Sequence, residues 1–217
     1  MLLYGLPHSA YSAKVRIALR LKGLDFEEVP PPDGYRSAAY RAIVPTGTVP
    51  ALDIGGRVLF ESDAIVEYLD EIVPEPPLLP SDPQMRAVAR AAARHHDGRI
   101  EPVIRGLFPL IGAEPLDRAA FQATGALLED RLSRMGEAFD PDPFIAGAGL
   151  SLSDLAYPGT LAMGKRLLGE GGVVIERPTS IDAWVGALMD EPVVNTAVDE
   201  MLAALENWIA SKKDTSA

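Results

Sequence analysis

The chain has 217 residues, 47% of them hydrophobic, so it is long enough to bury the core of one large domain or two small ones. Its 31 acidic residues outnumber its 20 basic ones and give a net charge of −11, which excludes a basic surface for nucleic acid or for an anionic membrane. There is no cysteine, so disulfides, thiolate metal sites and a cysteine nucleophile are excluded, and any thiol in the chemistry must belong to a ligand.

The first 74 residues alternate short strands and helices. The order β-α-β, a loop with a short helix, then β-β-α is that of a thioredoxin-like α/β domain, which we predict over residues 1–74. Strands are predicted at Leu2–Gly5 and Asp25–Val29 and, as a hairpin around Gly55-Gly56, within Pro50–Phe60; helices are predicted over Ser9–Gly23 and Ser62–Ile72.

A proline-rich connector separates this domain from a helical remainder. Five prolines fall between Ile72 and Gln84, and we place a stiff linker at residues 75–84. An all-helical domain is predicted over residues 85–210 and a frayed tail over 211–217. The expected helices are Gln84–Phe108, Leu116–Phe139, Ser151–Leu168, Ser180–Met189 and Val194–Ser211.

The terminus and the hydropathy pattern bear on location. The opening residues MLLYGLPHSA contain no basic segment followed by an apolar core, so we expect no signal peptide. No run of about 18 apolar residues is present, so we expect no membrane span. The predicted setting is the cytoplasm, and the predicted partners are small molecules.

Val49 and Pro50 stand at the entry to a predicted strand. A cis bond between them would leave the Val49 N–H and C=O facing outward, free to pair with an extended peptide. The alternative is a proline that only begins a strand.

Glu61 and Ser62 precede a predicted helix. Ser62 is expected to be the N-cap, with Asp63 near the positive helix end. A helix N-terminus also attracts a carboxylate, and Glu61 beside it would attract an ammonium group. The pair therefore suits an amino-acid head group, or simply a well-capped helix.

Five segments, taken together, resemble the cytosolic glutathione transferases. They are SAYSAKVRIALRLKGLDFEEV, PTGTVPALD, ESDAIVEYL, GLSLSDLAYPGTLA and SIDAWVGALMDEPVVNTAV, in this order along nearly the whole chain. The fourth contains Ser151 and Asp154, which we interpret as a structural capping box. The resemblance implies a homodimer that uses glutathione as co-substrate and acts on a hydrophobic electrophile.

The resemblance also implies roles for single residues. Val49, next to cis-Pro50, would bond the cysteinyl backbone of glutathione, and Glu61 and Ser62 would hold its γ-glutamyl head group. Thr48 occupies the position that in the family often holds a basic or amide partner of the glycyl carboxylate. Arg36 and Arg41 are the alternatives for that carboxylate.

The thiol-activating residue of the family's serine-using classes lies five residues before a basic residue followed by valine. Lys14-Val15 sets this register and selects Ser9 as the catalytic residue. The alternative for Ser9 is a plain helix N-cap. Tyr11 is expected in the pocket wall and His8 in the pocket or a loop. Whether either reaches the sulfur is left open.

The segment ARHHDGRIEPVIR is the most unusual part of the helical half. His95 and Arg99 share a helix face, and no third ligand follows in spacing, so no metal site is expected. In the family this helix borders the electrophile pocket and the dimer partner. His95, His96 and Arg99 are therefore candidates for the pocket, with a solvated helix face as the alternative.

The reaction subtype is left open. The zeta class carries Ser-Ser-Cys where this chain has Ser9-Ala10-Tyr11, which argues against maleylacetoacetate isomerisation. Our main hypothesis is a glutathione transferase. The alternatives are a glutathione-dependent isomerase, dehalogenase or ether-cleaving enzyme, and a non-catalytic binding protein on the same scaffold.

Overall fold

The first part of the chain folds as a four-stranded sheet with three helices. The structure is a computed structural model that describes residues 1–216. The strand order is β2-β1-β3-β4; β1 runs parallel to β2, and β3 runs antiparallel to β1 and β4. The elements are β1 (Leu2–Tyr4), α1 (Ala10–Leu21), β2 (Glu27–Val29), α2 (Ala38–Ile43), β3 (Ala51–Asp53), β4 (Val58–Phe60) and α3 (Ser62–Ile72). The predicted thioredoxin-like order is confirmed.

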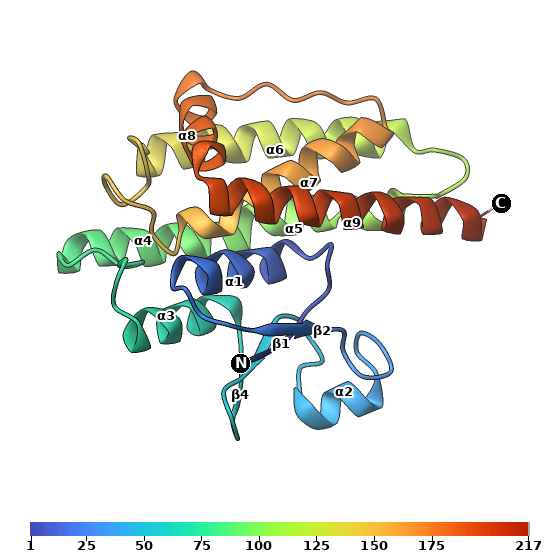
Figure 1. Ribbon diagram of the computed structural model, residues 1–217. Helices are drawn as coiled ribbons and strands as arrows, with labels where there is room; N and C mark the ends of the chain where they lie inside the picture. The colour runs from blue at the N-terminus through green and yellow to red at the C-terminus, as the bar shows by residue number, and fades with distance from the viewer. Residues whose placement is uncertain (217) are drawn as a thin grey trace.

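Alternation along the strands sends side chains to two different layers. Leu3 pairs with Leu52 in register, and both are fully buried among side chains of α1 and α3. The next pair, Tyr4 and Ala51, points to the other face, where the buried Tyr40 of α2 packs. Figure 1 shows α1 between the sheet and the helical half, with α2 on the far side.

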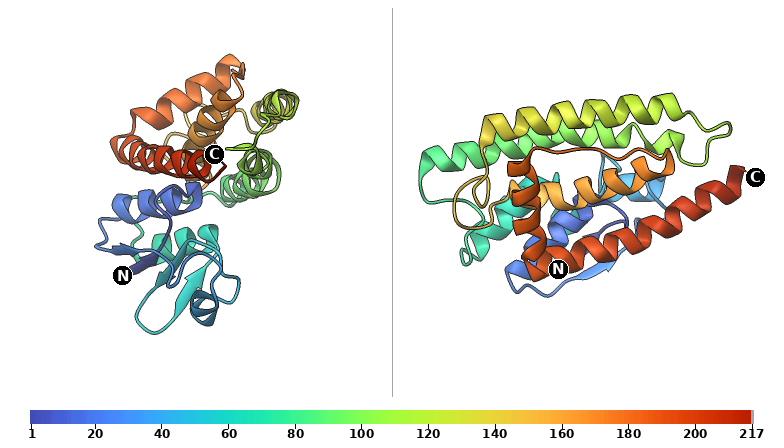
Figure 2. Two further views of the ribbon diagram at one scale, coloured as in Figure 1. Left: turned by 90° about the vertical axis from the view of Figure 1, so that its right-hand side faces the viewer. Right: turned by 90° about the horizontal axis from the view of Figure 1, so that it is seen from above.

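The remainder of the chain is helical. Its elements are α4 (Pro83–His95), a π-helical turn (His96–Ile100), α5 (Glu101–Arg105), a 3₁₀ turn (Phe108–Leu110), α6 (Arg118–Phe139), a second 3₁₀ turn (Asp154–Ala156), α7 (Tyr157–Glu170), α8 (Thr179–Asp190) and α9 (Pro192–Ser216). The two halves lie one above the other (Figure 2). Helix α1 packs against both α7 and α9, so its start lies where the halves meet.

Helix α4 ends earlier than the sequence predicted. The expected continuous helix over Gln84–Phe108 is broken by the π-helical turn, in which the Glu101 N–H donates to the His96 C=O, five residues back. Pro102 follows directly and has no N–H to offer Gly98. The wider turn accommodates this missing donor and rotates the side chains that follow.

Ser151 and Asp154 are paired, but only half of the predicted capping box forms. The Asp154 N–H donates to the Ser151 C=O at 3.0 Å and not to the Ser151 hydroxyl. The Asp154 carboxylate accepts hydrogen bonds from the Ser151 N–H (2.9 Å) and hydroxyl (2.6 Å). It also accepts from the Ile145 N–H and the Trp184 indole N–H, each at 3.0 Å. Asp154 thus ties a loop, the start of α7 and helix α8 together inside the core.

The ends of the elements refine the predicted boundaries. The connection between α3 and α4 runs from residue 73 to 82, and Asp82 caps α4 by accepting from the Met85 N–H at 3.2 Å. Residues 211–216 of the predicted tail continue helix α9, so the predicted boundary at residue 210 is not an element boundary; residue 217 lies outside the described part. Within residues 1–216, no helix combines the length and the apolar character needed to cross a bilayer.

Candidate active site

Ser9 stands at the first turn of α1 and faces a cavity. It is the N-cap, with extended backbone angles (φ −83°, ψ 123°), and its Oγ accepts from the Ser12 N–H at 3.2 Å. Ser12 is fully buried, and its own hydroxyl accepts from the Leu6 N–H at 3.3 Å. The Ser9 O–H has no acceptor among residues 1–216. Ser9 is therefore a helix cap that still has a proton to donate.

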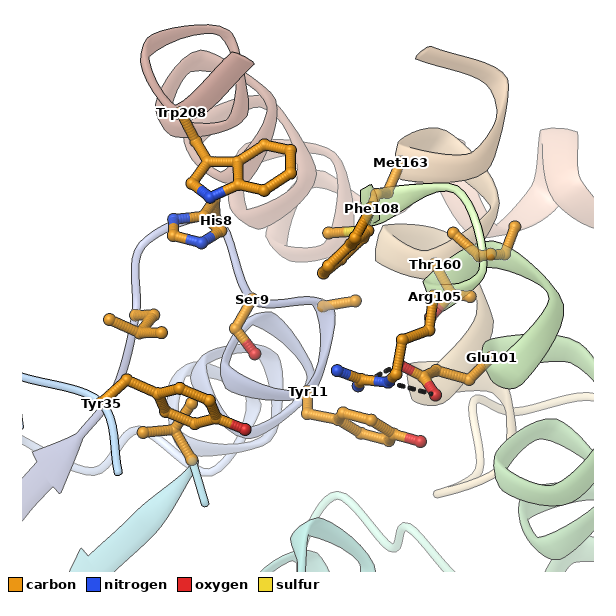
Figure 3. A pocket seen from close by; sticks show the side chains of 14 residues that line it. His8, Ser9, Tyr11, Tyr35, Glu101, Arg105, Phe108, Thr160, Met163 and Trp208 are labelled. Atoms are coloured by element: carbon orange, nitrogen blue, oxygen red, sulfur yellow. Dashed lines mark hydrogen bonds and ion pairs between the residues drawn. The ribbon is translucent and has the colours of Figure 1, made fainter. Parts of the chain in front are cut away.

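The cavity next to Ser9 has a volume of about 400 Å³ and is walled by both halves of the chain. The first half contributes the region around Ser9 and the loop residue Tyr35, and the second contributes α5, α7 and α9 (Figure 3). The lining residues are Leu6, His8, Ser9, Ala10, Tyr11, Tyr35, Val49, Glu101, Ile104, Arg105, Phe108, Thr160, Met163 and Trp208. Most of this wall is apolar or aromatic, so it suits a flat hydrophobic molecule.

Val49 presents unpaired backbone groups in the same cavity. Its bond to Pro50 is cis, as the sequence suggested. Within the described chain neither its N–H nor its C=O makes an intramolecular hydrogen bond. The preceding Thr48 does not line the cavity; its C=O accepts from the Tyr40 hydroxyl at 2.9 Å. Val49 is thus free to pair with an extended peptide, and Tyr40 holds the strand entry beside it.

The start of α3 lies in a neighbouring depression. Glu61, Ser62 and Asp97 line it together, outside the cavity that contains Ser9 and Val49. Ser62 is the first helical residue and not the N-cap that we predicted. Its Oγ accepts from the Lys14 ammonium at 3.3 Å, and Lys14 also forms an ion pair with Asp63. The buried Lys14 thereby fixes α3 against α1.

Glu61 has an unusual backbone conformation. It occupies the N-cap position with φ 68°, and its side chain makes no capping bond. A residue with a side chain adopts this left-handed region at a cost of order 1–3 kcal/mol. The side chain is exposed in the depression, where it can meet a ligand.

None of the three candidates His95, His96 and Arg99 lines the cavity. The His95 ring packs edge-on against Phe139 of α6 at 5.5 Å, and Arg99 is exposed elsewhere. Their predicted helical register does not apply across the π-helical turn.

His96 is fully buried behind the cavity wall. Its Nδ1 lies 2.8 Å from the Asp97 carboxylate and its Nε2 lies 2.9 Å from the Thr160 hydroxyl. The ring also packs edge-on against Tyr11 at 5.8 Å between ring centroids. Because Tyr11 and Thr160 both line the cavity, His96 supports the wall without touching its contents.

Burial favours the neutral form of two titratable side chains in the cavity wall, His8 and Tyr11. Burial lowers the pKa of His8, whose ring stacks on Trp208 with centroids 5.8 Å apart. Burial, and then the Asp97 carboxylate, raise the pKa of Tyr11. Burial is the largest single influence on Asp97 and opposes its ionisation, but the hydrogen bond to His96 and the further favourable interactions, Lys14 and Tyr11 among them, together lower the Asp97 pKa. Tyr11 therefore acts as a neutral hydroxyl.

The chain resembles known proteins over its whole length. It is 32% identical to a probable glutathione S-transferase of Oryza sativa subsp. japonica over 97% of this chain and 96% of that one. The chain belongs to the glutathione S-transferase family.

Further comparisons agree with this membership. The family profile described as glutathione S-transferase, N-terminal domain, matches residues 3–77. A theta class glutathione S-transferase from Xanthomonas axonopodis pv. citri, solved with glutathione bound, superposes with a TM-score of 0.75 at 26% identity, over 91% of this chain and 96% of that one. A maleylacetoacetate isomerase of Pseudomonas aeruginosa is 48% identical over 43% of this chain and 47% of its own.

Several wall residues of this glutathione S-transferase gave no signal in the sequence. Tyr35, Arg105 and Trp208 come from distant segments and meet only in the folded chain. For Arg105 the sequence offered a signal in Pro102, whose missing N–H predicts an interruption in the helix that leads to Arg105. Within residues 1–216 no cluster of three or more His, Asp or Glu side chains is arranged to hold a metal ion.

Proposed function

We propose that this protein is a glutathione transferase in which Ser9 activates the glutathione thiol for attack on an apolar electrophile bound in the cavity. The observation that carries the proposal is the free O–H of Ser9. Its oxygen already accepts from Ser12, and within residues 1–216 its O–H has no acceptor, so it is free to donate to a bound partner. The cavity wall next to it is apolar enough to receive a hydrophobic second substrate.

The energetics of thiol activation fit one hydroxyl at a helix start. A free thiol has a pKa of about 8.5, so about 3% is thiolate at pH 7. A decrease of about two units requires roughly 2.7 kcal/mol. A charge-assisted hydrogen bond of about 1.5–3 kcal/mol and a helix-end contribution of about 0.3–1 kcal/mol cover this amount.

The glutathione backbone is proposed to lie along Val49. Its free N–H and C=O would pair with the cysteinyl residue as an added strand does. Ser62 keeps its hydroxyl proton for the γ-glutamyl carboxylate because it accepts from Lys14, and Glu61 would take the ammonium. For the glycyl carboxylate, Thr48 stays a candidate alongside Arg36 and Arg41.

The reaction step is a substitution at carbon for an aryl halide. Loss of the thiol proton to solvent gives a thiolate, which donates its electron pair to the electrophilic carbon. A sulfur–carbon bond forms, and the carbon–halogen bond breaks as halide leaves with its electron pair. Ser9 stabilises the charged sulfur before the attack and takes no part in the bond changes.

The test compares Ser9→Ala with Ser12→Ala, since both hydroxyls lie in the same turn and only Ser9 faces the cavity. We expect Ser9→Ala to reduce kcat/KM for an aryl halide by about 10- to 100-fold, the equivalent of one charge-assisted hydrogen bond. Glutathione affinity, measured by calorimetry, should change less than about threefold. Wild-type turnover in Ser9→Ala, or an equal loss in Ser12→Ala, would refute the assignment.

A second candidate is glutathione-dependent isomerisation. It is favoured by the 48% identity to a maleylacetoacetate isomerase over 43% of the chain. The fully balanced change would be a cis-to-trans conversion with no net consumption of glutathione. The two activities are separated by measuring glutathione consumption with each substrate. Substitution on an aryl halide consumes glutathione, whereas isomerisation of a maleyl substrate converts the substrate and leaves the glutathione concentration unchanged.

We further propose a cytoplasmic homodimer, following the family resemblance. Sedimentation of the purified protein near twice the 23.2 kDa chain mass would support the dimer. A species that stays at the mass of one chain across a wide concentration range would refute it.

A further inference from the structure

A second pocket lies between α7, α8 and α9, outside the cavity that contains Ser9. Its volume is about 550 Å³, against about 400 Å³ for that cavity. Figure 1 shows α8 standing across the start of α9, with α7 beside both. Thr160 and Met163 of α7 line the cavity, whereas Leu161 and Lys165 line this second site, which we call the α7–α8–α9 pocket. The two sites therefore use different faces of the same helix.

The floor of the α7–α8–α9 pocket is apolar. Leu161 and Leu188 are buried beneath it, and Val185 and Leu202 are only partly covered by protein. A ligand that covers these side chains gains about 25 cal/mol for each Å² of apolar surface removed from water. A hollow of this size, with an apolar floor and a few charged side chains at its edge, has the character of a small-molecule site.

One cation at the edge of the pocket is already neutralised. Arg166 of α7 contacts Glu206 of α9, with Nη2 2.8 Å from Oε2, and Glu170 one turn further along α7, with Nη1 2.8 Å from Oε1. Two carboxylates thus satisfy this guanidinium, and the same contacts hold α7 against α9. Arg166 is therefore a structural part of the pocket wall.

Two other cations at the edge keep donors for a ligand. Lys165 is exposed and makes no ion pair or hydrogen bond within residues 1–216. Arg177 lies two residues before α8 and contacts Asp182 through Nη2 at 2.7 Å, whereas its Nε and Nη1 have no hydrogen-bond partner in the described chain. An ammonium and part of a guanidinium are therefore available to an anion at this edge.

The unpaired acid of the pocket, Asp199, lies toward its other end. Helices α7 and α9 run in the same direction, and Arg166 pairs with Glu206, 40 residues later (Figure 1). The same offset places Asp199 level with the first turn of α7, about 9 Å along the helix from Lys165. Because α9 begins two residues after α8 ends, Asp199 also lies near the last turn of α8, whereas Arg177 precedes its first.

We propose that the α7–α8–α9 pocket binds an aliphatic molecule that carries one carboxylate. The carboxylate contacts Lys165 and Arg177, and the apolar chain lies over Leu161 toward the end where Asp199 stands. A second carboxylate at that end would be repelled by Asp199, so the charges of the pocket also fix the orientation of the ligand. The site uses neither glutathione nor Ser9, and the inference goes beyond the proposed function.

The test compares decanoate with decylammonium, which have the same aliphatic chain and opposite charges. Each is titrated into the protein by calorimetry, below its micelle concentration and at low ionic strength, where exposed charges are least screened. The measured quantities are the Kd and the number of sites per chain. Because the chain carries a net charge of −11, non-specific attraction alone would favour decylammonium. A preference for decanoate therefore reports the local cations.

Four variants locate the bound ligand. Lys165→Gln removes the free ammonium, and Ala162→Leu adds apolar volume to the pocket. The control Arg57→Gln removes the same charge from an exposed position between β3 and β4. The control Arg105→Gln removes the cation of the cavity that contains Ser9. Circular dichroism of each variant verifies that it is folded.

We expect wild type to bind one decanoate per chain, about tenfold or more tightly than decylammonium. Lys165→Gln and Ala162→Leu should each weaken decanoate about three- to tenfold, and the two controls should change its Kd less than about twofold. Absence of saturable decanoate binding, or equal or tighter binding of decylammonium in wild type, would overturn the proposal.

Two patterns among the variants would overturn it as well. Equal losses in Lys165→Gln and Arg57→Gln would show a response to total charge. A loss in Arg105→Gln with Lys165→Gln unchanged would place decanoate in the cavity that contains Ser9. All titrations are made without glutathione, so failure of this inference is distinguishable from failure of the proposed function.

Discussion

Replacing Asp154 should destabilise the helical half more than any other single carboxylate change in the core. The side chain is fully buried and accepts four hydrogen bonds, from the Ile145 N–H, the Ser151 N–H and hydroxyl, and the Trp184 indole. In Asp154→Ala the Ser151 hydroxyl can turn to Ser153, whose Oγ is 2.7 Å away. The other three donors have no such alternative.

The expected magnitude follows from this count. A buried donor left without an acceptor costs about 1–3 kcal/mol, so three of them place Asp154→Ala at about 4–6 kcal/mol after partial relaxation. Asp154→Asn keeps one oxygen, which can still accept from Ile145 and Trp184, so its cost should be about 1–3 kcal/mol. Ser151→Ala removes one hydroxyl and should cost about 1 kcal/mol.

Equilibrium unfolding in urea, followed by far-ultraviolet circular dichroism at one fixed protein concentration, measures these differences. The expected order of destabilisation is Asp154→Ala, then Asp154→Asn, then Ser151→Ala. An Asp154→Ala cost below about 1.5 kcal/mol would refute the accounting. An equal cost for the Ala and Asn variants would show that the charge, and not the specific acceptors, stabilises this part of the core.

Two further predictions concern packing and pH. Gly169 has open space where a Cβ would be added, so Gly169→Ala should stabilise α7 by about 0.5–1 kcal/mol. A Cβ added at Gly171 meets the ring of Phe121, so Gly171→Ala should cost about 1–3 kcal/mol. The midpoint of thermal unfolding should therefore rise in Gly169→Ala and fall in Gly171→Ala. Because burial lowers the pKa of His8, the unfolded chain binds a proton first as the pH falls below about 6.5, and stability decreases. In urea titrations, His8→Gln should make this decrease in stability shallower between about pH 7 and 5. His95 is present in the wild type and in the variant, so the difference between the two pH profiles reports on His8. An unchanged pH dependence in His8→Gln would contradict the prediction.

Features that depend on a few neighbouring residues were predictable from the sequence. The start of α1 at Ser9 follows from a capping hydroxyl before an apolar repeat, and both are local signals. The contacts between Ser151 and Asp154 span three residues, and the cis bond needed only the pair Val49 and Pro50. The order of strands and helices was also predicted correctly, because it follows from local hydrophobic patterns and turn residues.

Features that depend on distant residues were not predictable. Ser62 was expected to cap its own helix, but the ammonium of Lys14, 48 residues earlier, takes its oxygen. His96 was expected at the pocket, but the turn that accommodates Pro102 places it behind the wall, against Thr160. In each case a partner far away in the sequence decided what the side chain does.

The sequence by itself determined where Ser9 stands and that a thiol must come from outside, because a helix cap is a local feature and the chain has no cysteine. Only the tertiary structure decided what Ser9 faces. Tyr35, Arg105 and Trp208 reach one cavity because the sheet and the helices bury their apolar faces against each other. That packing is a property of the whole chain, and no short segment encodes which side chains meet across it.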